Sequence, residues 1–487
     1  MLFNVISKAK IYIAKYNDMD VAVKASLWFA ICSILQKTIS FLTMPIFTRL
    51  MSIEQYGQYN IFLTWYSILA LFISLNLHSE IFNKGLVDNL EKKDEYTNNQ
   101  IGLLILLTII SLCIYLPFKN TINQALGLST FLMVIMILEI LSSSVIGIWL
   151  ARQRFDFKYN IIVKITLGMS IVTLSLGVIM VSFSDDKSVA KILSNAIVPM
   201  VISFFLLCNL RKNGSFFNNF KWWKLSVFSA IPLVPHYLSL VLLNQSDKLM
   251  INAFCGADKA AIYSVAHTAG LIMTIINNSI NASFVPWAYN KMKLYNGDGI
   301  KDISKSLLSV VWLVNVLLIW VAPEAIMFLA PPQYAEAAYC LIPIAISVYF
   351  YFAYTMFVDI EIYFGSTYLV ATASMLAAVV NVILNYIFIP MYGYLVAGYT
   401  TLISYFLTML LHYVFLRLVF IKHSFNRVLF SEKTILGYGS LLILAAFIIG
   451  SMYEYVVLRY SLLVLVLAII WKFKNSILSK LADLRRK

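Results

Sequence analysis

Fourteen apolar stretches, each long enough to cross a bilayer, run through this chain with only short segments between them. A hydrocarbon core of roughly 30 Å takes about 20 apolar residues in helical form, and only helices and closed barrels satisfy their backbone hydrogen bonds there. The stretches are continuously apolar, whereas barrel strands alternate. The sequence therefore predicts an all-α integral membrane protein with about 14 transmembrane helices. We place them at residues 25–47, 59–77, 100–118, 128–150, 161–183, 189–210, 225–245, 261–284, 303–322, 338–358, 367–389, 394–416, 434–450 and 455–472.

The positive charge of the chain is unevenly distributed. The net charge is +14 and, with both termini in the cytoplasm, most Lys and Arg residues fall in segments on the cytoplasmic side. The opposite side keeps only Arg49, Lys119, Lys187, Lys248, Lys259 and Arg459. Near span ends, Lys164, Lys191 and Arg459 are expected to extend their charged groups toward the interface. The asymmetry follows the positive-inside rule and orients the helices, so no nucleic-acid partner is predicted.

The segments between the spans restrict the activities open to this chain. None is long enough to fold into a catalytic domain. The sequence has no glycine-rich phosphate loop, no HExxH and no GxSxG motif, and its five cysteines form no CxxC pair. We therefore expect a transporter that is not an enzyme, with no cofactor and no metal site.

Ionisable side chains lie within several spans or at their ends. They are Lys37, Glu139, His236, Asp247 and Lys248. A charge at the centre of a membrane helix costs about 2.5–3.5 kcal/mol, so such groups normally face a cavity. Lys37 is either the partner of Glu139 or Asp247 in an ion pair or a cation presented to an anionic substrate group. His236 is either a core histidine with satisfied hydrogen bonds or a proton-coupling group.

The eighth span carries polar residues at helical spacing over four turns. They are His267, Gly270, Thr274, Asn277, Asn278 and Asn281. The eleventh span repeats the pattern weakly with Ser374, Asn381 and Asn385. Such residues either hydrogen-bond to neighbouring helices or line a passage for a sugar. We name as candidates for the passage Thr274, Asn277, Asn278, Asn281, Asn381 and Asn385.

Proline residues fall inside two predicted helices. Pro232 and Pro235 lie in the first half of the seventh span, and Pro45 lies near the end of the first. Each removes a backbone donor, so the helices are expected to bend or break at these positions. Irregular backbone at membrane depth is tolerated where it lines a cavity.

The ends of the first and seventh spans resemble each other. Thr48-Arg49-Leu50-Met51 and Asp247-Lys248-Leu249-Met250 lie about 200 residues apart, and each precedes a segment with Gly and Tyr. This weak repeat indicates two six-helix bundles followed by a helix pair. The predicted parts are a cytoplasmic N-terminal segment (1–24), the first bundle (25–210), a cytoplasmic linker (211–224), the second bundle (225–416), a cytoplasmic loop (417–433), helices 13 and 14 (434–472) and a basic cytoplasmic tail (473–487).

At these residues the chain resembles the polysaccharide-exporting, oligosaccharide-lipid flippases of the MATE-like MOP superfamily. The resembling stretches are Pro45 to Ser52 with Tyr56-Gly57, and Gln245 to Ile251 with Gly256 and Tyr263 to Ala266. The resemblance implies two pseudo-symmetric bundles around a central cavity that alternates access between the leaflets.

The resemblance also implies a substrate and partners. The substrate is an undecaprenyl-pyrophosphate-linked oligosaccharide, moved from the inner to the outer leaflet of the bacterial cytoplasmic membrane for O-antigen, lipopolysaccharide or capsule assembly. Membrane lipids, a polysaccharide polymerase and a chain-length regulator are the expected partners. The candidates for a cationic path for the pyrophosphate are Lys37, Arg49 and Lys248. The candidates for ion coupling are Glu139, Asp247 and His236.

Two other functions are compatible with the class. A MATE-like multidrug or metabolite cation antiporter would concentrate carboxylates and aromatic rings in its cavity, whereas this chain offers mostly Asn, Ser and Thr with an added Lys. A membrane-embedded glycan enzyme would need a long external loop with Arg, His and carboxylates, and the external loops here are short. The sequence therefore favours the flippase.

Overall fold

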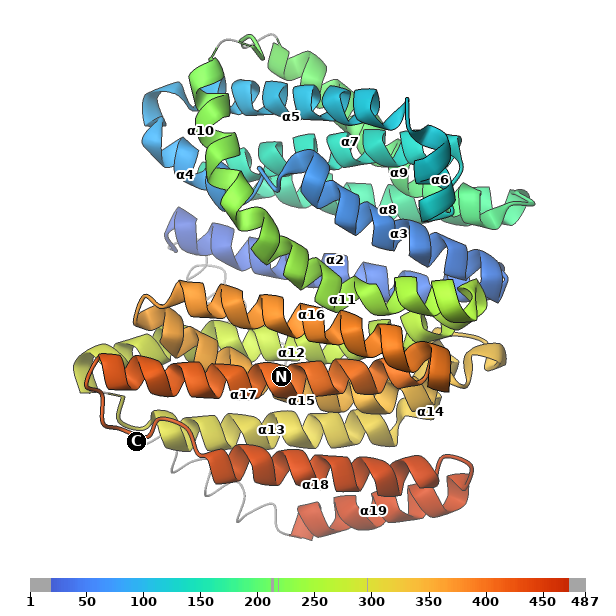
Figure 1. The fold of residues 1–487 in the computed structure, drawn as a ribbon, viewed down its shortest axis with the longest axis vertical. Coiled ribbons are helices and arrows are strands. Elements are labelled where there is room, and N and C mark those ends of the chain that lie inside the picture. Colours follow the sequence, from blue (N-terminus) through green and yellow to red (C-terminus); the bar gives the residue numbers. More distant parts are fainter. Residues whose placement is uncertain (1–18, 212–213, 218, 296, 473–487) are drawn as a thin grey trace, which may run out of the picture. The chain divides into compact units, whose positions relative to one another are not determined.

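Long apolar helices make up most of the described residues (19–211, 214–217, 219–295 and 297–472) in this computed structural model (Figure 1). The chain divides into two units, Met1–Leu238 (unit 1) and Ser239–Lys487 (unit 2). Among the sequence-based expectations, the tail at 473–487 and most of the N-terminal segment lie outside the described residues.

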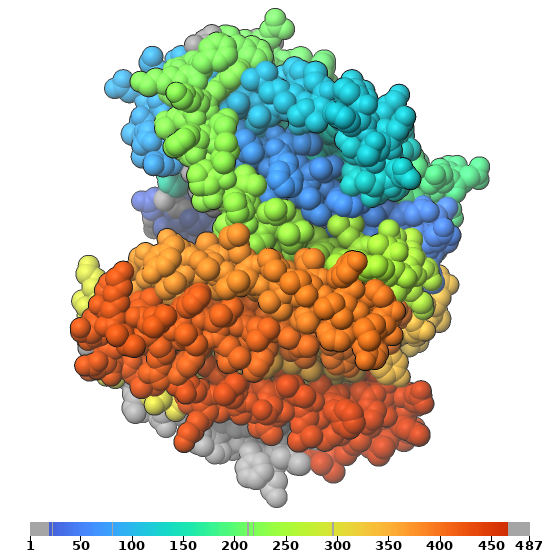
Figure 2. Space-filling model, in the orientation of Figure 1, coloured from blue at the N-terminus to red at the C-terminus, as the bar shows by residue number. Residues whose placement is uncertain are grey.

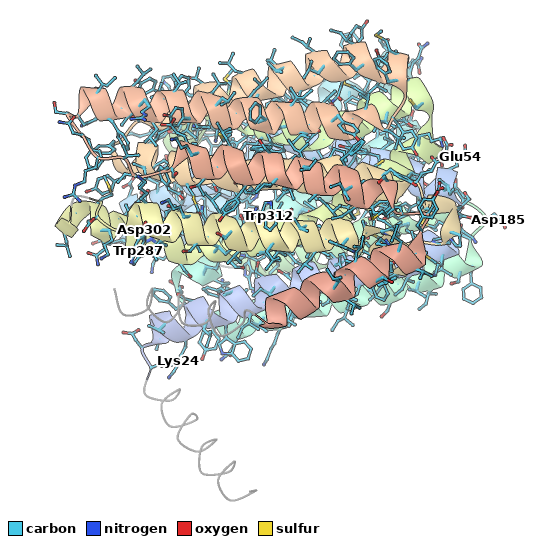
Figure 3. The ribbon with its side chains drawn as sticks, turned by 90° about the horizontal axis from the view of Figure 1, so that it is seen from below. Lys24, Glu54, Asp185, Trp287, Asp302 and Trp312 are labelled. Atoms are coloured by element: carbon cyan, nitrogen blue, oxygen red, sulfur yellow. The ribbon has the colours of Figure 1, made fainter. Side chains whose placement is uncertain are left out.

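Unit 1 is built from antiparallel helices joined by short turns. They are α2 (Val21–Leu50), α3 (Ile53–Ser74), α4 (Glu80–Asp88), η1 (Leu90–Lys92), α5 (Lys93–Tyr115), α6 (Lys119–Leu126), α7 (Thr130–Phe155), α8 (Tyr159–Phe183), α9 (Lys187–Arg211), α10 (Phe220–Ala230) and η2 (Ile231–Leu233). Figure 3 labels Lys24 near the start of α2 and Glu54 beyond its end, at opposite ends of the long helices.

Unit 2 begins within α11 (Val234–Cys255) and continues the antiparallel pattern. Its further helices are α12 (Ala257–Tyr295), α13 (Ile300–Trp320), α14 (Ala322–Leu329), η3 (Pro332–Tyr334), α15 (Ala337–Tyr363), α16 (Thr367–Tyr392), α17 (Val396–Lys422), α18 (Glu432–Ser451) and α19 (Val456–Lys472). Trp287 and Asp302 lie together at one end of α12 and α13 (Figure 3). We call this the basic end of unit 2, because it carries Lys291, Lys293, Lys301, Lys422, Arg427 and Lys433.

The predicted all-α membrane class is confirmed. In the part of the chain that the structure describes, 12 helices are long and apolar enough to cross a membrane. Each predicted span falls on one helix, except the seventh (225–245), which covers α10, η2 and α11; α3 and α19 are not among the 12. The first turns of α3 are polar, with Gln55, Gln58 and Asn60, and the described side chains of α19 form only the shorter apolar helix Val456–Leu465. The predicted count of about 14 is therefore approximate.

Serine side chains begin several of the helices. Ser52 caps α3 with a full capping box, in which its hydroxyl accepts from the Gln55 N–H at 3.2 Å and its own N–H donates to Gln55 Oε1 at 3.4 Å. Ser129 and Ser431 cap α7 and α18. These side chains satisfy backbone donors that the first turn leaves without a partner. Between α11 and α12 a single residue turns the chain, and Gly256 takes the positive φ of 95° that this turn requires.

The prolines act differently in the two predicted places. The break at Pro232 and Pro235 is confirmed, because the 3-10 segment η2 separates α10 from α11. At Pro45 the helix does not break, since α2 continues to Leu50. Near this proline, the Thr48 hydroxyl donates to Met44 O at 2.9 Å and the Arg49 guanidinium to Pro45 O at 3.0 Å, so the last turn is held by side-chain bonds.

Two apolar clusters form the core of unit 1. One joins α3, α7 and α9 around Phe62, Met136 and Ile192. The other joins α4, α5, α7 and α10 and includes Trp223, whose indole N–H donates to Asn99 O at 2.7 Å. Because Trp223 fixes α10 to α5, the compact unit extends to Leu238, whereas the sequence suggested a division at 211–224.

Helix α15 forms the centre of unit 2. It packs against α12, α13, α17 and α18, and most of its residues between Ala337 and Glu361 are buried. The approach to α17 is close, since a Cβ added at Gly398 would lie 2.6 Å from the Pro343 ring. Figure 2 shows α16 and α17 as a continuous outer layer on one face of this unit. Polar groups on α15 and α17 are therefore enclosed within the unit.

Arg459 anchors α19 to the helices before it. The prediction that this side chain extends to the interface is wrong, because Arg459 is only 1% exposed. Its guanidinium pairs with Glu324 and donates to Trp320 O at 3.2 Å, and the Trp320 indole donates to Arg459 O at 3.1 Å. A buried charge is stable when it is paired and hydrogen-bonded in this way.

A charged cluster joins α5 and α7 where they end in unit 1. Arg152 pairs with Asp156 and lies 2.9 Å from Asp94, and Lys93 lies 3.4 Å from Asp156. Partial burial alone would raise the pKa of the Asp156 carboxyl. The hydrogen bonds and positive charges of Arg152 and Lys93 outweigh burial and lower this pKa below its ordinary value.

We expect acid to destabilise unit 1 through Asp156. A carboxyl with a lowered pKa contributes stability above its unfolded-state pKa of about 3.9, and this contribution is lost as the pH falls through the folded-state pKa. When the pH is lowered from 6 to 3, the unfolding temperature should therefore fall further for the wild type than for Asp156→Asn. The difference between the two falls should be a few degrees, which corresponds to about 1 kcal/mol in the free energy of unfolding. Tryptophan fluorescence in detergent measures it, with Asp185→Asn, an exposed carboxylate, as control. Parallel curves for wild type and Asp156→Asn would contradict this assignment.

Candidate functional site

A buried carboxylate organises the polar interior of unit 2. Asp247 of α11 is 2% exposed. Its Oδ2 accepts from the Tyr263 hydroxyl at 2.5 Å and from the Thr401 hydroxyl at 2.7 Å, and its Oδ1 accepts from the Asn385 amide at 2.6 Å. The three donors come from α12, α17 and α16. One carboxylate thus connects four helices through short hydrogen bonds.

A second set of hydrogen bonds positions these donors. Asn381 Oδ1 accepts from the Ser246 hydroxyl at 2.9 Å and from the Asn385 amide at 3.2 Å, and the Asn381 amide donates to Thr401 at 3.4 Å. Thr400 donates to Asn385 Oδ1. We call this network the Asp247 cluster: Ser246, Asp247, Tyr263, Asn381, Asn385, Thr400 and Thr401.

All the hydrogen-bond donors that Asp247 meets in the Asp247 cluster are neutral, while Lys248 acts on the carboxylate only at longer range, without an ion pair. The nearest basic residue in sequence, Lys248, donates instead to Gln245 Oε1 at 3.1 Å, and no ion pair to Asp247 occurs among the described residues of unit 2. An ionised carboxylate in a low-dielectric interior is costly unless it is paired. This arrangement can therefore take up a proton or a small cation and release it again.

A small cavity of about 40 Å³ lies against the cluster. It is enclosed by α11, α12, α15 and α17, and its polar lining consists of Asn244, Asp247, His267, Thr274, Ser347, Thr401 and Tyr405. About 10–15 Å³ is enough for one water molecule, so the cavity has room for a few. The structure thus brings two sequence candidates, Asp247 and Thr274, to the same space.

The polar stripe of the eighth span divides between two faces of α12. Asn277 is buried and donates to Val348 O of α15 at 3.3 Å. Asn281 is partly exposed and interacts with Asp359 of α15. Asn278 is exposed. Interhelical hydrogen bonding, one of the two roles that the sequence left open, therefore applies to part of the stripe. Asn278 instead lies on the outside of the unit.

Cysteine labelling should distinguish these faces. In a background without the native cysteines, we expect Asn278→Cys to react with a hydrophilic thiol reagent added to cells, and Asn277→Cys to stay protected. The physical reason is that an exposed Asn in lipid would cost several kcal/mol, so the Asn278 face should meet water, whereas Asn277 contacts α15. The measurement is the fraction labelled at each position. Equal protection at both positions would remove Asn278 from any hydrated passage.

Asn381 and Asn385, predicted from the sequence to line a sugar passage, are fully buried in the Asp247 cluster. Their amide and carbonyl groups are engaged by Asp247, Ser246 and Thr400. In this structure the Asn385 amide binds the Asp247 carboxylate and also donates to Asn381. That the two residues contact a sugar stays a prediction.

A second polar interior lies in unit 1. Glu139 of α7 is buried, and Tyr59 and Tyr66 of α3 lie within electrostatic range of its carboxylate. Glu139 Oε2 has no hydrogen-bond partner among the described residues. Lys191 of α9 donates to Asn195 Oδ1 at 3.1 Å, and the Asn195 amide donates to the Tyr59 hydroxyl at 2.8 Å. Tyr59 thus interacts with both the Glu139 and the Lys191 side of this interior.

Lys191 is a cation that the sequence-based prediction misplaced. It was expected to extend to the interface, but it is 6% exposed, with Nζ 3.8 Å from the centre of the Phe47 ring. Cation–π contact and the Asn195 oxygen replace part of its hydration. The signal in the sequence was the i, i+4 spacing of Lys191 and Asn195 on one helix face.

The remaining candidates lie on α2 and α11. Lys37 is exposed, and within the described part of unit 1 it forms no ion pair with Glu139, one of the two partners considered above. Arg49 is exposed at the end of α2. His236 is partly exposed, one turn after η2, with its ring 5.7 Å from that of Tyr237.

Three buried ionisable residues of unit 2 were not identified from the sequence. Glu361 and His412 are fully buried against each other, and Asp359 is nearly buried. Glu361 and Asp359 lie just beyond the predicted span 338–358, outside every predicted helix. Their helix α15 continues to Tyr363. His412 lies inside a predicted span, and this position was the available signal.

The chain is similar to known polysaccharide proteins and transporters. Residues 22–290 match the polysaccharide biosynthesis protein family. The chain is 24% identical over 425 residues to the capsular polysaccharide biosynthesis protein CapF of Staphylococcus aureus, covering 82% of this chain and 100% of that protein. It is similar to the structure of the lipid II flippase MurJ in its inward closed conformation, with a TM-score of 0.67 and 15% identity. This match covers 93% of this chain and 100% of the MurJ chain. It is also similar to the inward-facing structure of a multidrug resistance MATE family transporter of the MOP superfamily. The TM-score is 0.59 and the identity 12%, and the match covers 83% of this chain and 100% of that one.

These similarities confirm the resemblance that the sequence motifs indicated. The structural matches show that the fold is that of MOP-superfamily transporters, and the apolar helices make this a multi-pass membrane protein. The family match covers more than half of the chain. The chain therefore belongs to the polysaccharide biosynthesis protein family.

Proposed function

We propose that this protein moves a polyprenyl-pyrophosphate-linked oligosaccharide from the inner to the outer leaflet of the bacterial cytoplasmic membrane. The step serves O-antigen, lipopolysaccharide or capsule assembly, and a polymerase and a chain-length regulator act on the product. The positive-inside rule orients the basic end of unit 2 and both chain termini toward the cytoplasm. Support comes from the family match, from the transporter fold and from the buried polar interiors of the two units.

The observation that carries the proposal is the Asp247 cluster. A carboxylate held by neutral donors from three other helices can bind and release a coupling ion. Because these helices share one hydrogen-bond network, occupancy of Asp247 changes the energy of their packing, which is the requirement for alternating access driven by an ion. Glu139 and His236 are the secondary candidates for coupling.

Cations and amides complete the proposed substrate path. Lys37 and Arg49 in unit 1 and Lys248 in unit 2 interact with the pyrophosphate, for which ammonium and guanidinium groups are suited. The sugar is in contact with the uncharged polar residues Thr274, Asn278 and Asn281. The buried Asn277, Asn381 and Asn385 support this lining through their interhelical hydrogen bonds. Lys37 is exposed, and it forms no salt bridge within the described part of unit 1.

Reconstitution tests the function directly. The purified protein is placed in vesicles with the polyprenyl-pyrophosphate oligosaccharides extracted from cells that lack its gene. Periodate, added outside at low temperature, oxidises only the sugars in the outer leaflet. In vesicles without protein the sugars of the inner leaflet should stay protected, whereas a flippase equilibrates the leaflets and leaves almost none protected. Unchanged protection would contradict the proposal, and cation-coupled efflux of a drug dye from the same vesicles would favour a MATE-like antiporter.

A further inference from the structure

Glu361 and His412 form an isolated buried pair where α15 contacts α17. Both side chains are 0% exposed. His412 Nδ1 lies 3.0 Å from Glu361 Oε2 and 3.2 Å from Oε1, so one nitrogen meets both carboxylate oxygens. The residues are 51 positions apart, and the contact exists only because the two helices pack closely.

The second imidazole nitrogen has no partner. His412 Nε2 is buried and makes no hydrogen bond with any described residue. The Tyr354 ring stacks on the imidazole, with centroids 5.3 Å apart and planes 12° apart, and Phe415 packs edge-on at 6.4 Å. These rings fix the orientation of the imidazole and leave Nε2 without an acceptor or donor. A structural ion pair would be expected to satisfy both nitrogens of a buried imidazolium.

The charged groups on the surrounding helices are engaged elsewhere. On α15 itself, Asp359 interacts with Asn281 of α12. On α17, Arg417 pairs with Glu432 of α18 at 2.7 Å. Away from this end, His267 lines the cavity at Asp247, Glu324 of α14 pairs with Arg459, and α16 has no charged residue. At the basic end, Asp302 of α13 pairs with Lys305, Lys291 lies over the Trp287 ring, and the remaining lysines of the packed helices, Lys293, Lys301, Lys422 and Lys433, are exposed. Among the described residues, His412 is therefore the basic group that faces Glu361.

This geometry defines a place for one proton. With the Nδ1 hydrogen donated to an ionised Glu361, neutral His412 presents the Nε2 lone pair, and the pair carries one negative charge. A proton that binds at Nε2 converts the imidazole to imidazolium and brings the net charge of the pair to zero. Because a net charge is costly in a low-dielectric interior, burial of the pair favours the loaded state and hydration favours release.

The pair is linked to the Asp247 cluster through aromatic rings along the same helix contact. The Tyr354 ring that stacks on His412 also stacks on Tyr405, with centroids 6.2 Å apart and planes 13° apart. Tyr405 lines the small cavity together with Asp247 and Thr401. Protonation at His412 and occupancy at Asp247 therefore act on one packed interface between α15 and α17.

We propose that Glu361 and His412 form a proton-binding site, loaded at His412 Nε2 from the basic end of unit 2, and that proton binding there is coupled to the transport cycle. Glu361 lies two residues before the end of α15 at this end, so the path from cytoplasmic water is short. The coupling part rests on the proposed translocation function, whereas proton binding itself does not.

Histidine NMR of the full-length protein in nanodiscs tests proton binding without any substrate. The chain has five histidines, and the His412 signal is the one that disappears in His412→Gln. Between pH 5 and pH 9 we expect this signal to titrate as a single proton at Nε2. In Glu361→Gln, which keeps a hydrogen-bond acceptor but has no negative charge, the midpoint should move to lower pH by one unit or more, a tenfold change in proton affinity. The exposed His423 is the internal reference.

Two results would overturn proton binding at this site. One is a His412 signal that keeps one protonation state over the whole range, and the other is the same midpoint in wild type and Glu361→Gln. Unchanged signals of the other four histidines show that the variant is folded.

The vesicle assay with an imposed pH gradient then tests coupling. A proton-coupled wild type should change its rate of leaflet exchange with the gradient, and His412→Gln should lose this dependence. If the wild type exchanges lipid but ignores the gradient, coupling at this pair is refuted while the flippase function stands. If the wild type exchanges no lipid, the proposed function fails, and the NMR result is unaffected.

Discussion

Asp247→Asn is expected to reduce glycan export strongly while the protein stays in the membrane. The amide keeps the size of the side chain and can still accept from Tyr263 or Thr401, but it has no charge to attract a coupling ion. Hydrogen bonds to charged groups contribute about 1.5–3 kcal/mol, which corresponds to roughly 10- to 150-fold in ion affinity. Surface glycan, measured at equal membrane abundance of the protein, should fall by about that factor.

Asp247→Ala should have a further effect on stability. It leaves three buried donors, on Tyr263, Asn385 and Thr401, without their acceptor, and each unsatisfied group costs about 1–3 kcal/mol. We therefore expect a lower unfolding temperature and lower abundance than for Asp247→Asn. The matched control is Asp258→Asn, which removes an exposed carboxylate from the same unit. Normal export by Asp247→Asn would exclude Asp247 as the coupling group.

Lys37→Ala is expected to abolish or nearly abolish surface glycan without destabilising the protein. Lys37 is exposed on α2 and forms no ion pair within the described part of unit 1, so its removal breaks no internal interaction. A loss of export would then indicate that a contact with an anionic substrate group is lost. A charge-assisted hydrogen bond of this kind contributes tenfold or more to the affinity for the substrate. The readout is surface glycan, with membrane abundance and unfolding temperature measured in parallel.

Lys164→Ala is the control for Lys37→Ala, because it removes one exposed lysine from α8 of the same unit. It should leave export unchanged if position matters and net charge does not. Lys37→Arg keeps the charge and should restore part of the activity. Full export by Lys37→Ala would exclude this residue from the pyrophosphate path, and equal losses in both variants would point to a general effect of charge on insertion.

The sequence by itself determined the class of this protein and the position of its helices. Bilayer thickness acts on consecutive residues, so apolar runs give the spans directly, and every predicted span has a helix. The interruption at Pro232 and Pro235 was equally local, because a missing backbone donor acts within one turn. The presence of Asp247 as a costly polar group at a span end was also visible in the sequence.

Only the tertiary structure decided which polar groups meet. Asp247 binds Asn385 and Thr401 from 138 and 154 residues away, and Glu361 meets His412 only because α15 packs on α17. Adjacent Asn277 and Asn278 have opposite environments, since one step along a helix turns the side chain by about 100°, and the neighbouring helices determine which direction is buried. Lys191 shows the same limit, because its position near a span end suggested the interface, whereas the packing of α9 against α3 and α7 encloses it. Helix rotation and pairing depend on contacts between distant segments, and hydropathy along one segment contains no record of them.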